Sequence, residues 1–101
     1  MATRNDDDCS KLRDHLIEAL TQLRAGDFSV RMALKSSDPR DREIAELFNQ
    51  VVGLNETITG EFARLSKVVG KEGEITHRAR VKGAGGGWQT KLNAVNELVD
   101  E

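Results

Sequence analysis

The chain has 101 residues, of which 38% are hydrophobic and 4% are aromatic, and its formal net charge is −2. This length allows one small domain or two smaller modules, and the shortage of aromatic residues excludes a large aromatic core. The near balance of 15 basic and 17 acidic residues offers no overall attraction for nucleic acid or for an anionic membrane. Because small modules bury little surface, we expect self-association.

The start of the chain and its single cysteine bear on the compartment. Cys9 is the only cysteine, which excludes an internal disulfide. The opening stretch MATRNDDDCSK has no apolar segment typical of a signal peptide, and no apolar run approaches the roughly 20 residues of a membrane span. We therefore expect a cytoplasmic protein without direct membrane contact.

A first helix is predicted after the polar, acidic residues 1–9, which read as a tail or a helix lead-in. Its start lies at Ser10 or in the preceding aspartate run, since both residue types cap helices. Gly26 is suited to end it. Apolar residues spaced four, three and four apart define its buried face: Leu12, Leu16, Ala19 and Leu23.

After Gly26 the apolar period changes to two. In FSVRMAL, residues 28–34, apolar residues alternate with polar or small ones, which indicates an extended segment with one buried side. A β-strand is one interpretation. Because no second strand lies nearby and a lone strand is unstable, we favour an extended connector that lies against helices. Pro39 then marks a loop before the next helix.

A long helix is predicted from Asp41 to Val69 or Gly70. Its apolar residues recur at steps of three and four, as in the seam of a coiled coil. Two steps of four follow one another at Leu54–Ile58–Phe62, and such a stutter locally unwinds a coiled coil. The whole seam consists of Ile44, Leu47, Val51, Leu54, Ile58, Phe62, Leu65 and Val69.

The same order of elements then recurs. Residues 70–73, GKEG, end the helix; EITHRARVK, residues 74–82, alternates; and Trp88 begins another helix after the loop GAGGG. A shift of 47 residues pairs Gly26 with Gly73, Arg31 with Arg78, Lys35 with Lys82, Asn49 with Asn96 and Val52 with Val99. A shift of 46 pairs Leu12 with Ile58, Leu16 with Phe62, Ala19 with Leu65 and Leu23 with Val69. We therefore divide the chain into a tail (1–9), a first module (10–56) and a second module (57–101).

Motifs for catalysis or ligand binding are weak. The stretch KGAGGGWQTK, residues 82–91, lacks the Gly-Lys-Ser/Thr that closes a phosphate loop, so we favour a flexible connector. His77 lies in an alternating segment, which favours a partly buried or surface histidine over a phosphoaccepting one. One cysteine and two distant histidines form no metal cluster. We expect no enzyme activity, no cofactor and no nucleic-acid partner.

The connector GDFSVRM and the helix start REIAELFN resemble the HAMP domain, a signal-relay module of bacterial sensor kinases and chemoreceptors. The continuation through residue 101 looks like the tandem HAMP arrays of soluble hybrid histidine kinases. The resemblance covers roughly residues 10–101. It implies an all-α fold: a parallel homodimer of two consecutive four-helix coiled-coil bundles joined by a continuous helix.

The resemblance also implies roles for residues. The dimer core would contain Leu16, Leu23, Ile44, Leu47, Val51, Leu54, Ile58, Phe62, Leu65, Val69, Leu92 and Val95. Connector packing would involve Gly26, Phe28, Val30 and Met32 in the first copy and Gly73, Ile75, Ala79 and Val81 in the second. The helix starts are marked by Glu43 and Trp88. The family often has Asp-Glu-x-Gly where this chain has residues 42–45, REIA, and the second copy has no such acid.

Two functions follow as hypotheses. The first is a non-enzymatic relay that transmits conformational change between input and output domains of a histidine kinase or receptor. Its partners would be a second copy of the chain and the adjacent sensor or kinase domains. The alternative is a static coiled-coil dimerisation scaffold, which explains the seam but not the repeated glycine and connector.

Overall fold

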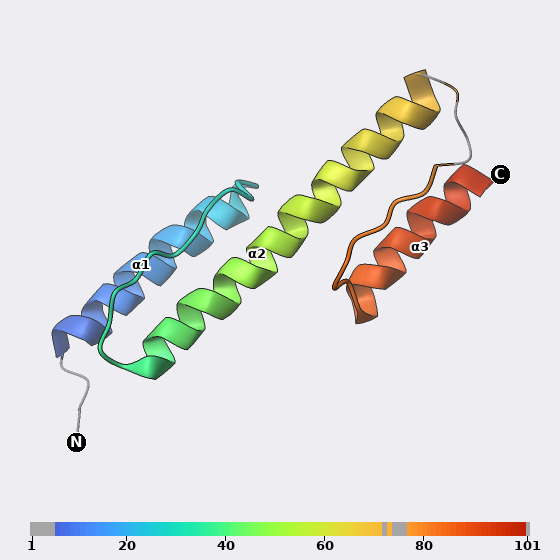
Figure 1. Cartoon of the computed structure of the whole chain (residues 1–101). Coiled ribbons are helices and arrows are strands. Elements are labelled where there is room, and N and C mark those ends of the chain that lie inside the picture. The colour runs from blue at the N-terminus through green and yellow to red at the C-terminus, as the bar shows by residue number, and fades with distance from the viewer. Residues whose placement is uncertain (1–5, 72, 74–76, 101) are drawn as a thin grey trace. The chain divides into compact units, whose positions relative to one another are not determined.

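A computed structural model describes residues 6–71, 73 and 77–100. Within these residues the chain is all-helical and contains no strand, which confirms the predicted all-α class. The helices are α1 (Asp6–Arg24), α2 (Pro39–Ser66) and α3 (Gly86–Asp100), and α2 continues into a π-helical turn, η1 (Lys67–Lys71) (Figure 1).

The chain divides into two compact units, Met1–Gly53 (unit 1) and Leu54–Glu101 (unit 2). Unit 1 consists of α1, an extended connector and the first half of α2. Unit 2 consists of the second half of α2, another connector and α3. The sequence placed the division three residues later, between residues 56 and 57. In each unit the connector returns along the helices, so the two helices of a unit run in the same direction (Figure 1).

In unit 1, glycine ends the first helix as the sequence predicts. Gly26 has a φ of 94°, a left-handed conformation that suits glycine. The Gly26 N–H donates to the Leu23 carbonyl oxygen at 2.9 Å, and the Asp27 N–H donates to the Gln22 carbonyl oxygen at 3.1 Å. This pair of bonds is a Schellman motif, which satisfies carbonyls that the helix leaves open.

The starts of the two helices of unit 1 compare differently with the prediction. Helix α1 begins at Asp6, in the aspartate run that the sequence offers as one of its two starts. Helix α2 begins at Pro39 rather than Asp41, because proline is tolerated at the first helical position. Asp38 caps α2: its Oδ1 accepts from the Arg40 N–H at 2.9 Å.

The core of unit 1 lies between the connector and the two helices. Val30 and Met32 of the connector are buried, whereas Arg31 between them and Ala33 after them are exposed, so the predicted alternation is present without a strand. The buried cluster contains Leu12, Ala19, Val30, Met32, Ala45 and Val52, and the half-buried Leu16, Leu23, Phe28, Leu34 and Phe48 pack against it.

Unit 2 repeats this arrangement with the residue sizes exchanged. Its buried cluster contains Leu65, Ala79 and Leu92, which correspond to Ala19, Met32 and Ala45 of unit 1. Unit 1 therefore fills the space with a large connector side chain between small helical ones, and unit 2 does the reverse. Such exchanges keep the packed volume roughly constant, which is why one backbone accepts both. Around the cluster pack Phe62, Val69, Val81, Ala84, Val95 and Val99.

The π-helical turn lies where the second copy has one residue more than the first. Leu23 and Gly26 are three residues apart, but their counterparts Val69 and Gly73 are four apart. A π-helical turn takes up one residue beyond an α-helical turn, so η1 absorbs the insertion while Gly73 keeps a left-handed φ of 71°. The helix was expected to end at Val69 or Gly70 and instead extends to Lys71.

Candidate functional site

An asparagine side chain clamps the connector to the second helix in unit 1. The Met32 N–H donates to Asn49 Oδ1 at 2.7 Å, and Asn49 Nδ2 donates to the Met32 carbonyl oxygen at 2.9 Å. The amide thus satisfies both backbone groups of a connector residue whose side chain is buried. An extended segment without a neighbouring strand needs such partners, because unpaired buried backbone groups are costly.

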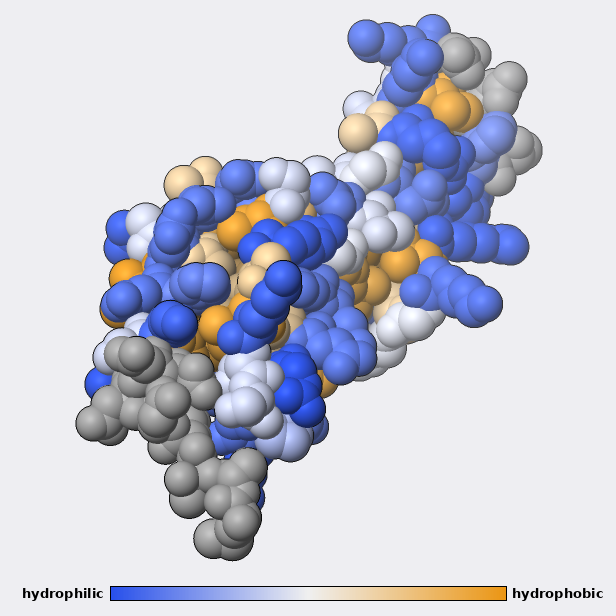
Figure 2. Space-filling view, turned by 60° about the vertical axis from the view of Figure 1, so that its left-hand side comes forward, coloured by the Kyte–Doolittle hydropathy of each residue, from blue (hydrophilic) through white to orange (hydrophobic). Residues whose placement is uncertain are grey.

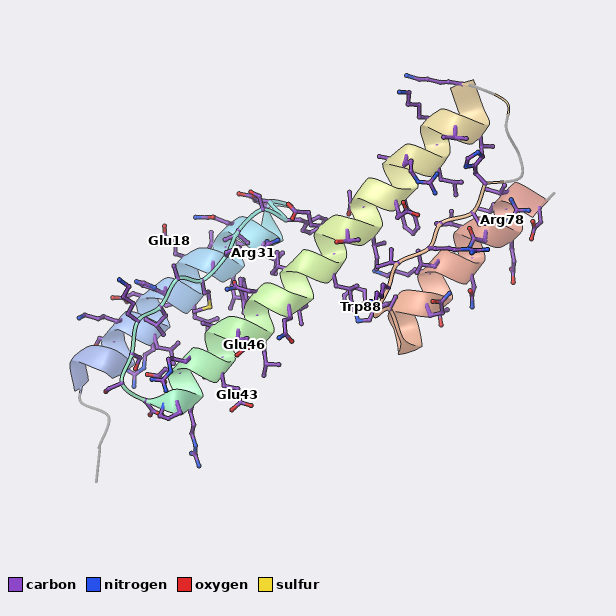
Figure 3. The ribbon with its side chains drawn as sticks, viewed as in Figure 1. Glu18, Arg31, Glu43, Glu46, Arg78 and Trp88 are labelled. Atoms are coloured by element: carbon purple, nitrogen blue, oxygen red, sulfur yellow. The ribbon has the colours of Figure 1, made fainter. Side chains whose placement is uncertain are left out.

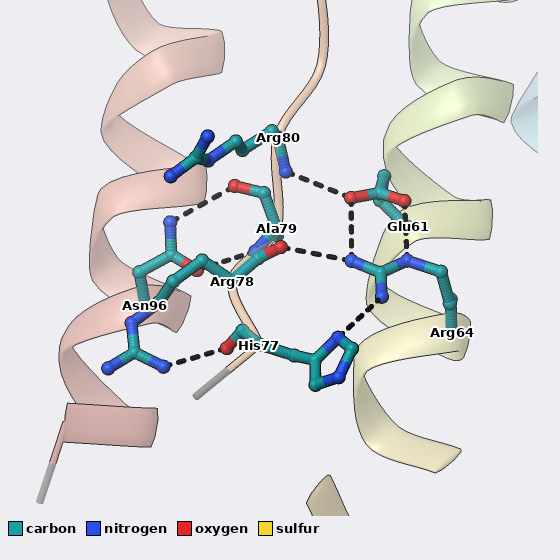
Figure 4. A network of polar contacts seen from close by, with 7 residues as sticks. All are labelled: Glu61, Arg64, His77, Arg78, Ala79, Arg80 and Asn96. Carbon is teal, nitrogen blue, oxygen red and sulfur yellow. Dashed lines mark hydrogen bonds and ion pairs between the residues drawn. The ribbon is translucent and has the colours of Figure 1, made fainter. Parts of the chain in front are cut away.

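The same clamp recurs in unit 2, shifted by 47 residues at both ends. The Ala79 N–H donates to Asn96 Oδ1 at 2.8 Å, and Asn96 Nδ2 donates to the Ala79 carbonyl oxygen at 3.1 Å (Figure 4). The sequence identified Asn49 and Asn96 as a repeated pair but gave them no role. Their signal was a polar residue repeated at one register of two otherwise apolar helical faces.

The repeated arginines of the connectors also make corresponding contacts. Arg31 Nη1 donates to the Val30 carbonyl oxygen at 2.8 Å, and Arg78 Nη1 donates to the His77 carbonyl oxygen at 2.7 Å. Arg78 in addition forms an ion pair with Asp100 of α3. The counterpart of Asp100 is Gly53, so unit 2 has an ionic link between connector and helix at a position where unit 1 has glycine.

A polar network joins α2 to the connector in unit 2 (Figure 4). Arg64 Nε donates to Glu61 Oε1 at 2.8 Å, and Arg64 Nη2 donates to the Arg78 carbonyl oxygen at 2.9 Å. The Arg80 N–H donates to Glu61 Oε2 at 2.9 Å, and Arg64 Nη1 lies 3.5 Å from His77 Nδ1.

The network shifts the pKa values of Glu61 and Arg64, which form its ion pair. The hydrogen bond from Arg64, followed by that from the Arg80 N–H, lowers the pKa of Glu61 below its ordinary 4.5. The hydrogen bond to Glu61 in turn raises the pKa of Arg64. The pair stays ionised and ties the connector to α2.

The corresponding place in unit 1 is different. His15 and Glu18 stand where unit 2 has Glu61 and Arg64. They line an open groove of about 220 Å³ beside the connector, together with Ala19, Gln22, Val30, Arg31, Met32 and Ala33. Both side chains are exposed, so this groove lacks the buried polar groups that orient a ligand in a binding site.

Large apolar side chains are exposed on one side of unit 1. The exposed fractions are 65% for Ile17, 48% for Leu20, 38% for Ile44, 53% for Leu47 and 48% for Val51. We call these five residues the open face of unit 1. Several large apolar side chains exposed on one side are typical of an interaction site. Figure 2 shows apolar side chains reaching the surface between hydrophilic ones.

The five positions point to the same side of the helix pair. On α1, Ile17 and Leu20 each follow a residue of the buried stripe by one position. On α2, Ile44 and Val51 each precede a buried residue by one position. Because one residue turns a helix by about 100° and the two helices run in the same direction, these offsets point to one side.

The predicted dimer-core residues fall into three groups in the single chain. Ile44, Leu47 and Val51 are exposed. Leu16, Leu23, Leu54, Phe62, Val69 and Val95 are half-buried, and Ile58, Leu65 and Leu92 are buried within unit 2. Ile17, Leu20 and Leu98 are also large, apolar and exposed, and the predicted dimer core does not include them.

The predicted connector and helix-start residues are also placed. Val30 and Met32 are buried and Phe28 and Val81 are half-buried, while Ile75 lies outside the described residues. Glu43 is exposed on α2 (Figure 3). Trp88 is half-buried at the start of α3, with Lys91 Nζ 5.2 Å from the centre of its ring.

Metal-ligand and membrane features are absent from the described part of the chain. No group of three or more His, Cys, Asp or Glu side chains there could hold a metal ion. None of the described helices is long and apolar enough to span a membrane. A comparison with models of known protein families gave no match, and a comparison with solved structures also gave none.

Proposed function

We propose that this chain is a tandem, HAMP-like signal-relay module without enzyme activity that works in the cytoplasm as a parallel homodimer. The observation that carries the proposal is the duplicated unit of helix, clamped connector and helix, which leaves an apolar face open. The connector clamps account for the repeated element that a plain coiled coil lacks.

A second copy of the chain is the partner that fits the open face best. Ile44, Leu47 and Val51 follow one another at steps of three and four, the spacing by which a helix meets another helix in a coiled coil. Each unit alone buries a small core, and oligomerisation is a common supplement in modules of this size. Two copies related by a two-fold axis would bring four helices together in each unit, as a bundle.

The relay would use α2, which takes part in both units. A signal that favours one packing of unit 1 over another would change the packing of α2, and the same helix would carry this change into unit 2. Coupling of this kind requires two discrete arrangements that the signal biases differently. The partners before and after the module would be sensor and kinase domains of a longer protein, and no cofactor is needed.

A static dimerisation scaffold is the second candidate. The asparagine clamps favour it, because they fix each connector on its helix. The two functions differ in one result. The comparison is made at chain concentrations at which both variants sediment as dimers. In a relay, Leu47→Ala in unit 1 then changes the rate at which Leu98→Cys cross-links between copies in unit 2, whereas in a static rod this rate stays the same.

A cysteine cross-linking scan tests the proposal. In a Cys9→Ser background, single cysteines replace neighbouring residues of α2, one exposed and one buried. We expect cross-linked dimers for Ile44→Cys and Val51→Cys but not for the matched controls Ala45→Cys and Val52→Cys, which are buried inside unit 1. Equal yields at exposed and buried positions, or no dimer at any position, would contradict the proposal.

A further inference from the structure

The internal repeat gives each residue of the open face a counterpart in unit 2. The shift is 46 residues on the first helix of each unit and 47 on the second. The pairs are Ile17 with Ala63, Leu20 with Ser66, Ile44 with Lys91, Leu47 with Ala94 and Val51 with Leu98. All ten residues are exposed, so the same side of the helix pair is open in both units.

The chemistry of the two faces differs. In unit 1 all five side chains are large and apolar. In unit 2 only Leu98 is large and apolar, with an exposed fraction of 71%, and the other four positions hold Ala63, Ser66, Lys91 and Ala94. Apolar area removed from water drives association, so a second copy would gain much more from the unit 1 face.

Lys91 adds a charge to the poorer face. Around a two-fold axis it would approach its own copy, and like charges placed opposite each other disfavour pairing. Its ammonium group also lies over the ring of Trp88 within its own chain. No position of the unit 1 face carries a charge.

The unit 2 face also has a hollow. An apolar groove of about 300 Å³ opens at Ser66, between the end of α2 with η1 and the end of α3. Leu65, Val69, Val95 and Leu98 are among the residues that line it. At the counterpart of Ser66, unit 1 has Leu20, a larger and apolar side chain. Close packing of side chains is what makes a bundle interface stable, and unit 2 provides less of it.

We infer that unit 1 forms the stable part of the homodimer interface and that unit 2 forms a weak part, which separates while unit 1 still holds the two copies together. This inference rests on the proposed homodimer and assigns the change of packing between copies to unit 2. The helices of unit 2 change their packing between copies, and the partner of both faces is a second copy of this chain.

Matched cysteines test the inference in the full chain. In a Cys9→Ser background, Leu47→Cys and Ala94→Cys occupy corresponding positions of the two faces. We expect Leu47→Cys to cross-link between copies at least about tenfold faster than Ala94→Cys under the same oxidant, since each tenfold corresponds to roughly 1.4 kcal/mol of difference in pairing.

Exchanging the faces provides the control. Lys91→Ile together with Ser66→Leu gives unit 2 the residues of unit 1 at two positions of the face and is expected to raise the cross-linking rate of Ala94→Cys toward that of Leu47→Cys. The positions exchanged are exposed, so folding within unit 2 is retained, and the circular dichroism of the helices checks this.

The outcomes separate the two proposals. Equal rates at residues 47 and 94, or a faster rate at 94, overturn the inference while the homodimer stands. An exchange that leaves the rate at 94 unchanged overturns it as well. If neither cysteine cross-links and the chain sediments as a monomer, the homodimer is wrong and the inference falls with it.

Discussion

Units 1 and 2 share the glycine and the asparagine that hold each connector, and they differ in many of the side chains around them. Both have a glycine of positive φ before the connector and an asparagine that clamps it. In the core, large and small residues exchange places: Ala19, Met32 and Ala45 in one unit, Leu65, Ala79 and Leu92 in the other. On the open face, no such exchange compensates for the lost apolar side chains of unit 2.

This difference separates two kinds of constraint. A core must keep its volume, so a large residue lost at one position reappears at a neighbouring one. The residues of an exposed face need not keep a constant volume within the unit, and their chemistry is set by what the face binds. The divergence of the open faces therefore points to different demands at the two ends of the module.

The largest loss of stability is expected when the large residue of the unit 2 core is made small. Leu92→Ala leaves Ala79 facing another small residue, and the cavity should destabilise unit 2 by about 2–5 kcal/mol. Urea unfolding followed by the fluorescence of Trp88, the only tryptophan and a residue of unit 2, measures this loss.

Ala79→Met provides the rescue. Added to Leu92→Ala, it restores the size pattern of unit 1 and should recover part of the lost stability. Alone, beside Leu92, it should overpack the core by about 1–3 kcal/mol. A double variant no more stable than Leu92→Ala would show that the exchange does not govern packing.

A smaller loss of stability is expected when either asparagine clamp is removed. Asn49→Ala and Asn96→Ala each leave the N–H and carbonyl of a connector residue without the side chain that binds them. Each should cost about 1–3 kcal/mol. Hydrogen exchange of the Met32 and Ala79 amides should accelerate in the respective variants. Asn93→Ala on the exposed side of α3 is the control, and an equal effect there would argue against a clamp.

Replacing the glycine before the connector by alanine should change stability still less. The change should be opposite in sign to that of the same substitution at a helical glycine. Gly26→Ala forces a side chain into a left-handed conformation and should cost about 1–2 kcal/mol. Gly60→Ala lies within α2 with open space around it and should gain about 0.5–1 kcal/mol. Thermal unfolding of the two variants distinguishes these signs, and stabilisation by Gly26→Ala would contradict the cap.

The smallest expected effect is the pH dependence of the stability of unit 2. Because the folded-state pKa of Glu61 is lowered below 4.5, its stabilising contribution is complete above that value and is lost as the pH falls through the lowered pKa. Since Arg64 is exposed and Glu61 is half-buried, water screens the pair and we expect a loss below about 1 kcal/mol. Glu61→Gln should remove this part of the acid sensitivity. An unchanged pH profile of Trp88 fluorescence would assign the sensitivity to other groups.

The sequence predicted the features that depend on spacing along the chain. Steps of three and four predicted the helices, the period of two predicted the connector at residues 28–34, and the 46- and 47-residue shifts identified the repeat. These patterns record which side of an element is buried, and burial is the dominant requirement of folding.

The remaining features depend on contacts between elements. The bonds of Asn49 to Met32 span 17 residues, and no local pattern specifies such a partner. The sequence shows the extra residue before Gly73. That a π-helical turn accommodates it depends on the packing of both Val69 and the connector, which the sequence does not specify. The exposure of Ile17 and Leu20 likewise follows from which side of α1 meets the connector.

Sedimentation equilibrium of the Cys9→Ser chain tests most directly whether the open face of unit 1 joins two copies. We expect a species of twice 11.2 kDa. We further expect that Leu47→Asp shifts the mass toward 11.2 kDa, whereas Ala94→Asp, at the corresponding position of unit 2, leaves the dimer in place. A parent chain of 11.2 kDa, or a dimer that Leu47→Asp does not weaken, would contradict it.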